Sequence, residues 1–466
     1  MEFNVRVISS YIPEICGIAT HSQDLITALG HSREIDSVRL TAIDKSNGKN
    51  LYHFPVDLVI NQYDENSWYQ AAGAILERAH ARPTPTVMLL QHEYGLSGRN
   101  ALGNDYQGIA RIFKEGGKNS VTVVNLHTVE RNPNEHQKRV IQELSDLADG
   151  IVVPTLSAIE ILSSETYGIN LSKLKHIDHG IRIQDLSSIN PNDVRAKYNL
   201  GGKLIVGTLG LKSTGKGIEF GIEAYGRMIS KFFSETSEER KKIVYLVAGQ
   251  YHPGFIADSP KEHEEIEKRI QEIIKKQRLK TIKTKSLEKL TREDIDNNDV
   301  IIYDCHLDEQ DLRDFYTAID IVLLPYRNKE QISSGILADA VGSGKPVIAT
   351  KFAHAKELLC PGNHIKKGII GNNPDSRGIL VDLIGKYENR PSINQMAKAL
   401  EYLVFNEQAR SQMVKNASSR GHEMNWDNVT RELVQYCSLL LENKFAQKSE
   451  PVIITRDVEA KEPKKE

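Results

Sequence analysis

The stretch "KLIVGTLGLKSTGKGIEFGIEAYGRMI" (203–229) carries the pattern that decides the fold. An apolar run of strand type leads into a glycine-rich turn, and a helical pattern follows the turn. Backbone N–H groups at the start of such a helix favour an anion, and Lys216 adds a positive charge to the turn. This order predicts a buried strand, a phosphate-binding turn and a helix.

The turn almost matches the Walker A loop, which reads G-x-x-x-x-G-K-[ST]. Gly210, Gly215 and Lys216 occupy the expected positions, but Gly217 stands where a Ser or Thr would hold magnesium. Asp304, after the run "VIIYD", could supply the acidic residue of a later strand. The missing hydroxyl disfavours a nucleoside triphosphatase. A tight turn with a surface lysine is the plainer interpretation and stays open at this point.

Strand-type runs followed by helical patterns recur along the chain. The first half contains "VRVIS", "TVMLLQ", "VTVVNLH" and "GIVVPT", and the second half contains "KIVYLVAG", "IDIVLLPY" and "KPVIAT". These Val-, Ile- and Leu-rich runs do not alternate with polar residues, which is typical of strands covered on both faces of a parallel sheet. Pro, Asn and Gly interrupt the series at 190–204. We therefore predict an α/β fold with two doubly wound, Rossmann-like domains that face each other across a cleft.

The composition excludes several classes of protein. The chain has 466 residues, and its 60 Lys and Arg residues nearly balance its 62 Asp and Glu residues, so we expect no nucleic-acid partner. The first residues do not resemble a signal peptide, and no window has the roughly 20 apolar residues that a membrane span needs. No zinc or redox spacing links the cysteines, which are Cys16, Cys305, Cys360 and Cys437. We expect a cytoplasmic protein that needs neither a metal nor a cofactor.

A second informative stretch is "LPYRNKEQISSGILADAVGSGKPVIAT" (324–350). A strand is expected to end at Leu324, and Ser333 or Ser334 is a natural N-cap for the short helix that follows. Ligands of open α/β sheets bind beyond the carboxyl ends of the strands, where this helix would begin. Asp339 on the helix could accept hydrogen bonds from sugar hydroxyls. The plainer interpretation is a capped helix with an ordinary surface aspartate.

In these two stretches the sequence resembles the family-4 glycosyltransferases, which are retaining nucleotide-sugar enzymes of GT-B fold. The resemblance implies that Lys216 contacts the donor diphosphate together with Gly210 and the backbone of Ser333, Ser334, Gly335 and Ile336. The family usually has an arginine five residues before the lysine, and here that position is Leu211. Either Lys212 supplies the missing charge or the site carries one charge fewer.

The family also has two glutamates separated by seven residues, and "QISSGILADA" matches this frame. Gln331 replaces the first glutamate, and Asp339 replaces the second. The resemblance implies that Asp339 binds the ribose and that Gln331 contacts the donor sugar without a charge.

The resemblance covers most of residues 1–440. "CGIATHSQDL" is similar to the first glycine loop, which implies that Gly17 lies close to the donor, with His21 facing either the phosphates or solvent. "QHEYGLSG" (91–98) and "NLHTVE" (125–130) are similar to acceptor-side loops of a subgroup with "CGIAT" and "QHEYG" signatures. They imply that His127 acts on the donor sugar and that His92 and Glu93 bind the acceptor, with Glu93 as an alternative base. "HIDHGI" places His179 where the family has an asparagine.

The resemblance also implies the domain organisation. We expect an acceptor-side domain at 1–198, a nucleotide-sugar domain at 199–420, and a helix at 421–445 that crosses back to the first domain. The polar residues 446–466 are expected to be a disordered tail.

The expected reaction is transfer of a hexose from a nucleoside diphosphate sugar to an acceptor hydroxyl, with retention of configuration and without metal. The departing phosphate would take the acceptor proton, so no nucleophile is nominated. A retaining disaccharide phosphorylase or synthase and a sugar-nucleotide epimerase are alternatives on the same fold. Leu211 and Gln331 also leave open a degenerate, non-catalytic sugar-nucleotide-binding protein.

Overall fold

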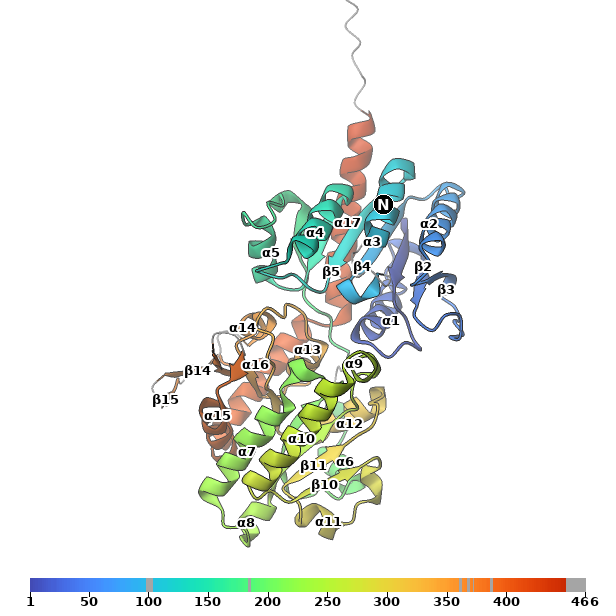
Figure 1. The fold of residues 1–466 in the computed structure, drawn as a ribbon. Coiled ribbons are helices and arrows are strands. Elements are labelled where there is room, and N and C mark those ends of the chain that lie inside the picture. Colours follow the sequence, from blue (N-terminus) through green and yellow to red (C-terminus); the bar gives the residue numbers. More distant parts are fainter. Residues whose placement is uncertain are drawn as a thin grey trace, which may run out of the picture.

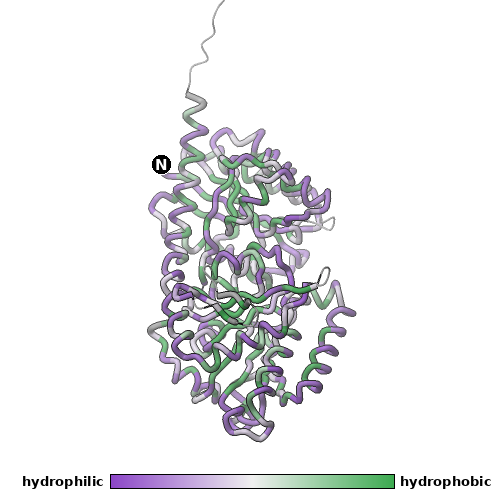
Figure 2. Tube along the Cα trace, turned by 90° about the vertical axis from the view of Figure 1, so that its left-hand side faces the viewer, coloured by the Kyte–Doolittle hydropathy of each residue, from purple (hydrophilic) through white to green (hydrophobic). Residues whose placement is uncertain are grey.

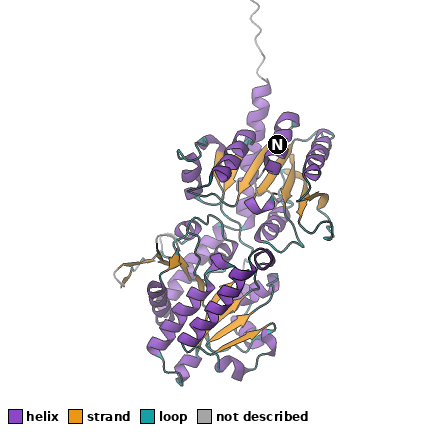
Figure 3. Ribbon diagram, viewed as in Figure 1, coloured by secondary structure: helices purple, strands orange, loops and turns teal. Residues whose placement is uncertain are grey.

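The computed structural model describes residues 1–97, 104–182, 186–359, 363–366, 369–371, 373–385 and 389–449. The chain forms two lobes, one above the other in Figure 1, and each lobe has a twisted sheet with helices on both faces (Figure 3). Hydrophobic residues fill the interior of both lobes, and hydrophilic residues dominate the outer helices (Figure 2). The predicted α/β fold with two doubly wound parallel sheets is confirmed.

The first lobe contains a seven-stranded parallel sheet with the order β3-β2-β1-β4-β5-β6-β7. Its strands are β1 (Phe3–Ser9), β2 (Ile35–Asp44), β3 (Val56–Asn61), β4 (Thr86–His92), β5 (Ser120–Leu126), β6 (Gly150–Val153) and β7 (Leu174–His176). Its helices are α1 (Gly17–Leu29), α2 (Glu65–His80), α3 (Asn104–Gly116), α4 (Glu135–Leu147) and α5 (Leu156–Ser163).

The second lobe contains a nine-stranded sheet with the order β10-β11-β9-β8-β12-β13-β16-β14-β15. Its strands are β8 (Leu204–Leu209), β9 (Ile243–Ala248), β10 (Thr281–Thr284), β11 (Val300–Tyr303), β12 (Ile321–Leu324), β13 (Val347–Thr350), β14 (Asn363–Lys366), β15 (Ile369–Ile370) and β16 (Gly378–Val381). All pairs are parallel except the last, β14–β15. A small hairpin, β17 (Leu383–Ile384) and β18 (Arg390–Pro391), follows.

Helices cover both faces of the second sheet (Figure 3). They are α6 (Pro191–Lys197), α7 (Ile218–Phe232), α8 (Glu238–Lys241), α9 (Pro253–Asp258), α10 (Pro260–Lys276), α11 (Arg292–Asp296), α12 (Glu309–Ala318), α13 (Gly335–Gly342), α14 (Ala353–Leu358), α15 (Ile393–Phe405) and α16 (Glu407–Glu423). The charged stretch 257–297, expected to be mostly helical, also supplies the edge strand β10.

The apolar runs form strands of sheets with two covered faces, where every side chain of a strand is removed from water. All residues of β1, β4 and β9 are buried, as the lack of alternation in their sequences predicts. Each sheet therefore lies at the centre of its lobe, and its carboxyl-end loops are the positions that remain open to a ligand.

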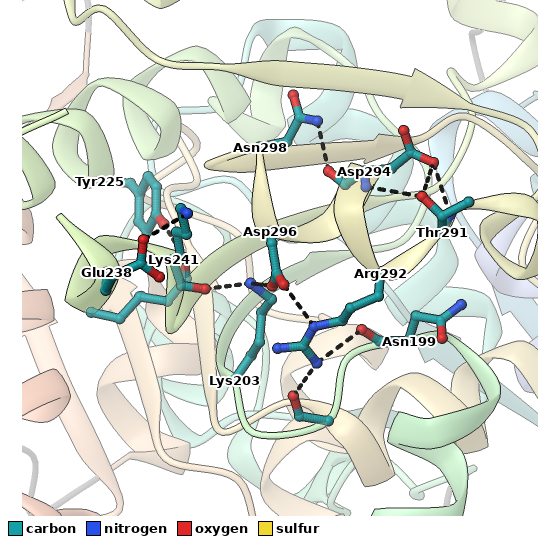
Figure 4. Close-up of polar contacts among 12 residues, drawn as sticks. Asn199, Lys203, Tyr225, Glu238, Lys241, Thr291, Arg292, Asp294, Asp296 and Asn298 are labelled. Atoms are coloured by element: carbon teal, nitrogen blue, oxygen red, sulfur yellow. Dashed lines mark hydrogen bonds and ion pairs between the residues drawn. The ribbon is translucent and has the colours of Figure 1, made fainter. Parts of the chain in front are cut away.

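A polar network closes the opposite, amino end of the second sheet (Figure 4). Lys203, just before β8, forms an ion pair of 2.7 Å with Asp296 of α11. Asp296 also bonds Arg292 at 2.9 Å. These groups lie on the far side of the sheet from the loops that follow the strands, so we assign them to the stability of the lobe.

Two segments connect the lobes, and they touch each other. The first runs from β7 to α6, and the second joins α16 to α17 (Trp426–Ser449). The Ile181 N–H donates to the Met424 carbonyl at 3.2 Å. A Cβ on Gly180 would lie 2.5 Å from the Trp426 ring, so a glycine is needed where the segments meet. The two connections therefore cross as one bonded unit.

Helix α17 lies along the first lobe, although it follows helices of the second (Figure 1). Its buried side chains, which include Val429, Leu433 and Leu441, pack with Val5 and Leu25 of the first lobe. The helix continues to Ser449, so the tail predicted from residue 446 begins within it. Residues 450–466 lie outside the described residues, as does Cys360. No described helix is long and apolar enough to cross a membrane.

One carboxylate of the second lobe caps a helix of the first. Glu357 of α14 accepts hydrogen bonds from the N–H groups of Leu156 and Ser157, at 2.6 and 2.9 Å. The N-cap residue of α5, Thr155, makes no side-chain cap of its own. Ile332 and Ala353 of the second lobe also pack within the core of the first. The lobes are thus joined by a charged cap and an apolar contact.

We predict that Glu357→Ala loosens this joint. Loss of a helix cap costs about 1 kcal/mol, so we expect the apparent Tm to fall by about 1–3 °C. Hydrogen exchange at the amides of residues 156 and 157 should become faster. Glu160→Ala, on the exposed side of the same helix, is the matched control. Unchanged exchange at these two amides would contradict the capping role.

Candidate functional site

A cavity of about 880 Å³ lies between the lobes, at the carboxyl ends of their strands. The first lobe contributes the loop after β1, the face of α1 and residues that follow β4 and β5. The second lobe contributes residues that follow β8, β9, β11 and β12. Predicted site residues in its wall are Gly17, Glu93, His127, Gly210, Lys216, Gln331, Ser333, Ser334, Gly335, Ile336 and Asp339.

The lysine-bearing turn is bound directly to the loop that leads to α13. Gly217 has a φ of +61°, and a Cβ there would lie 2.1 Å from the Pro325 carbonyl oxygen. Next to this contact, the Arg327 N–H donates to the Gly215 carbonyl at 2.8 Å. A Ser or Thr at 217 would be strained and would collide with Pro325, so the turn cannot be a Walker A loop with a magnesium-binding hydroxyl.

Lys216 lies on an aromatic platform. Its ammonium is 3.9 Å from the centre of the Tyr326 ring, and Tyr326 stacks on Phe352 with 5.2 Å between ring centres. A cation over an aromatic face is attracted by the negative charge density of the ring. No carboxylate of the described residues pairs with Lys216, so its charge is available to a ligand in the cavity.

The amino end of α13 presents two unused backbone donors to the cavity. Ser334 is the N-cap, and its hydroxyl accepts from the Leu337 N–H. The Ser334 N–H itself donates to His354 Nδ1 at 3.0 Å, which removes it from the set of donors predicted for a diphosphate. Gly335 and Ile336 are the first residues of the helix, and their N–H groups have no partner within it. These two amides are the donors that remain for an anion.

The structure corrects the prediction for Lys212. Its side chain is buried, and Nζ lies 2.6 Å from Asp304 and 4.6 Å from the centre of the Tyr251 ring. Lys212 does not line the cavity, because the strand direction turns it towards the carboxyl end of β11. The prediction that Lys212 replaces the missing arginine charge is therefore wrong, and Asp304 is occupied by this ion pair.

The structure also corrects the prediction for His92. The ring is fully buried between Tyr94 and Tyr106, each 5.2 Å away between ring centres, and burial lowers its pKa to about 4. Because His92 is the last residue of β4, its side chain points into the core, and the next residue points into the cavity. His92 is thus a core residue and not an acceptor ligand.

Glu93 lines the cavity, as was expected for both His92 and Glu93. One carboxylate oxygen accepts from the Tyr94 N–H at 3.1 Å, and the other accepts from the Thr128 hydroxyl at 2.6 Å. Burial raises the pKa of Glu93, with these hydrogen bonds opposing the rise. A fixed carboxylate with a raised pKa is suited to accept a proton from a hydroxyl.

His127 is buried, and its ring lies in a group with the partly exposed rings of His21 and His179 at the junction of the lobes. Its Nε2 bonds Gln91 Oε1 at 2.8 Å, and its ring lies 4.9 Å from His21, which lies 5.0 Å from His179. Burial lowers the pKa values of all three histidines, that of His127 to about 3. These side chains are therefore neutral at physiological pH. They offer hydrogen bonds to a ligand without adding charge, and His21 faces the cavity, not solvent.

Sequence reasoning missed several charged residues of the cavity wall, and Asp24 and Arg182 are two of them. Asp24 lies two helical turns after Gly17, so a search for polar residues at helical spacing from Gly17 would have found it. Arg182 lies on the connecting segment, and its backbone N–H donates to Asp339 Oδ1 at 2.7 Å. No local pattern marks Arg182, because its place in the wall depends on how the lobes meet. Within the described ranges, no group of three or more His, Cys, Asp or Glu is placed to hold a metal ion.

The ionisation of Asp24 is expected to make the stability of the folded protein depend on pH. Burial raises its pKa to about 7; Arg182 opposes the rise, and the carboxylates of Asp339 and Glu309 add to it. The unfolded chain has a pKa of about 3.9 at such a residue, so the folded state binds the proton more tightly. Wild-type stability is therefore expected to fall as pH rises from about 4 to about 7.

We predict that Asp24→Asn removes this loss. The Tm of the variant relative to wild type should increase from pH 4.5 to pH 8 in thermal melts. Asp146→Asn, at an exposed position of α4, is the matched control for replacing an aspartate with asparagine. If the Tm difference between Asp24→Asn and wild type stayed constant from pH 4.5 to pH 8, this account of Asp24 would be ruled out.

Comparison with known proteins supports the fold. No protein-family model and no curated protein matches the sequence. Among solved structures, a sucrose-phosphate synthase from Thermosynechococcus elongatus has a TM-score of 0.66 at 15% identity over 95% of this chain and 100% of its own. HepE from Anabaena, in complex with UDP and glucose, has a TM-score of 0.62 at 15% identity over 93% and 99%.

An α,α-trehalose 6-phosphate synthase from Burkholderia multivorans has a TM-score of 0.62 at 12% identity over 97% of this chain and 99% of its own. These likenesses extend over both lobes. At identities of 12–15%, the likenesses concern architecture. Together with the two facing sheets, they show that the chain has the GT-B fold.

Proposed function

We propose that this protein is a glycosyltransferase that moves a hexose from a nucleoside diphosphate sugar to an acceptor hydroxyl, with retention of configuration and without a metal. The observation that carries the proposal is the single wall formed by Lys216 and the amino end of α13, which faces the first lobe across the cavity. HepE, of the same fold, was solved with UDP and glucose, which supports a nucleotide-sugar donor.

Stabilisation of the departing diphosphate would come from fixed positive groups. Lys216 is held over Tyr326, and the N–H groups of Gly335 and Ile336 point from the positive end of the α13 dipole. Such preorganised donors lower the barrier because they need no reorientation when charge develops on the leaving group. Asp339 would accept hydrogen bonds from the ribose.

The acceptor hydroxyl would lie on the side of the first lobe. The departing phosphate oxygen takes its proton in the reaction we favour, and Glu93 is the alternative base because its raised pKa and cavity position suit that role. Neutral His127 would bond a hydroxyl of the donor sugar. Closure of both lobes around the substrates aligns the reacting atoms and excludes water that would hydrolyse the donor.

A non-catalytic sugar-nucleotide-binding protein is the second candidate. Leu211 lacks the charge expected at its position, and Lys212 is paired with Asp304. Fewer positive groups stabilise a leaving diphosphate less. Incubation with UDP-, GDP- and ADP-sugars and a panel of hydroxyl acceptors separates the two. Release of nucleoside diphosphate only in the presence of an acceptor supports transfer, and tight binding without turnover supports the binding protein.

We predict that Lys216→Ala lowers kcat/KM about 100- to 1,000-fold, as expected for a lost partner of a developing anion. Steady-state kinetics with the active donor measures the effect. Lys268→Ala, at an exposed position of α10, controls for removal of a lysine. Full activity of Lys216→Ala would remove this residue from the site.

We predict that Asp339→Asn chiefly weakens binding of the donor. Asn keeps a carbonyl oxygen for the Arg182 N–H but loses the charge, so donor Kd should rise about 10-fold with little change in Tm. Asp339→Ala also loses the bond to the connecting segment and should have a lower Tm. A change in acceptor KM alone would show that α13 does not bind the donor.

A further inference from the structure

The cavity contains a positively charged side chain that has no place in the mechanism above. Of the described residues in the wall, Lys216 is the only lysine and Arg182 is the only arginine. Carboxylates are more numerous there: Glu14, Asp24, Glu93, Asp308, Glu309, Glu330 and Asp339. A ligand with two phosphates needs more positive charge than Lys216 alone supplies in such surroundings.

Arg182 is fixed at its backbone but not at its side chain. Its N–H is bonded to Asp339 Oδ1 at 2.7 Å, so the residue cannot swing away from α13. Its Nε is buried and has no hydrogen-bond partner among the described residues. A buried guanidinium donor without a partner is costly, and native proteins rarely leave one unused. The geometry therefore points to a partner that enters the cavity.

The surroundings of Arg182 do not supply that partner. Three carboxylates lie in this region, on α1 (Asp24), α12 (Glu309) and α13 (Asp339). The charge of Arg182 lowers the pKa of Asp24, whereas Asp339 and Glu309 raise it. No ion pair within 4.0 Å joins the guanidinium to any of them in the described part of the chain. Arg182 thus offsets their charge at longer range and keeps its donors for a ligand.

We propose that Arg182 binds a phosphate group of the ligand and replaces, from the connecting segment, the positive charge that is absent at Leu211. Arginine presents a planar fork of N–H groups that matches two phosphate oxygens. The phosphate belongs either to the donor diphosphate or to a phosphorylated acceptor, since both would occupy this cavity. The identity of the donor rests on the function proposed above, but the binding of phosphate by Arg182 can be tested without it.

Arg182→Met keeps the backbone bond to Asp339 and most of the side-chain volume, and it removes the charge. Arg182→Lys restores a charge without the fork. Arg227→Met, on the outer side of α7 where Arg227 pairs with Glu223, is the matched control. Titration calorimetry gives Kd for inorganic pyrophosphate, UDP and glucose 6-phosphate, with uridine and glucose as uncharged counterparts.

We expect Arg182→Met to weaken at least one phosphorylated probe about 10-fold or more, because a hydrogen-bonded charge is lost, and to leave uridine and glucose unchanged. Arg182→Lys should recover part of the loss. If Arg182→Met loses affinity for UDP and pyrophosphate, the phosphate that Arg182 binds belongs to the donor. If it loses affinity for glucose 6-phosphate alone, that phosphate belongs to the acceptor.

The proposal is overturned if all three phosphorylated probes bind Arg182→Met as they bind wild type, or if wild type binds none of them. It is also overturned if the substitution weakens the binding of uridine or glucose to the same extent. Failure of the proposed function gives a different result. In that case, wild type transfers no sugar and binds no nucleoside diphosphate, yet Arg182→Met still loses affinity for pyrophosphate or glucose 6-phosphate.

Discussion

The close approach of Gly217 to Pro325 is the contact on which the site depends. A side chain at 217 would collide with the Pro325 carbonyl, and the positive φ of the residue would strain it further. The contact is available because β8 and β12 are neighbours in the sheet, so the segments that follow them leave side by side. It fixes Lys216 over Tyr326 and directs the following loop towards α13. One glycine thus brings a lysine and a helix end into the same wall.

Charge is distributed unevenly around the cavity. The three histidines at the junction of the lobes, His21, His127 and His179, are neutral because desolvation lowers their pKa values, so they pack closely without repulsion. Seven carboxylates line the described wall, against the two cations Lys216 and Arg182. An anionic ligand would be held at few points in such a cavity and repelled elsewhere. This arrangement favours a single orientation of an anionic ligand and disfavours tight binding of anions in general.

The sequence predicts the architecture well because burial on both faces leaves a direct mark on strands such as β1 and β9. The turn at Lys216 and the N-cap at Ser334 are also visible, since each depends on local backbone chemistry. Side-chain direction at strand ends is less predictable. His92 and Glu93 are adjacent, yet one enters the core and the other the cavity.

Long-range pairing is not visible in the sequence either. Lys212 looks like a spare cation until β11 places Asp304 beside it. Arg182 enters the wall only through the meeting of the two lobes, and Glu357 caps α5 across some 200 positions of sequence. The roles of the residues in the wall stay predictions, because position in a cavity does not establish what a side chain does there.

The bonded crossing of the two connecting segments limits how the lobes can move. A single linker would allow the second lobe to swivel freely, but here two strands of backbone are tied by the Ile181–Met424 bond and by the ion pair of Arg420 with Asp178 at 2.6 Å. Two segments that are bonded to each other allow fewer relative rotations of the lobes than a single linker would. This restriction favours the same alignment of the facing groups each time the two lobes approach each other.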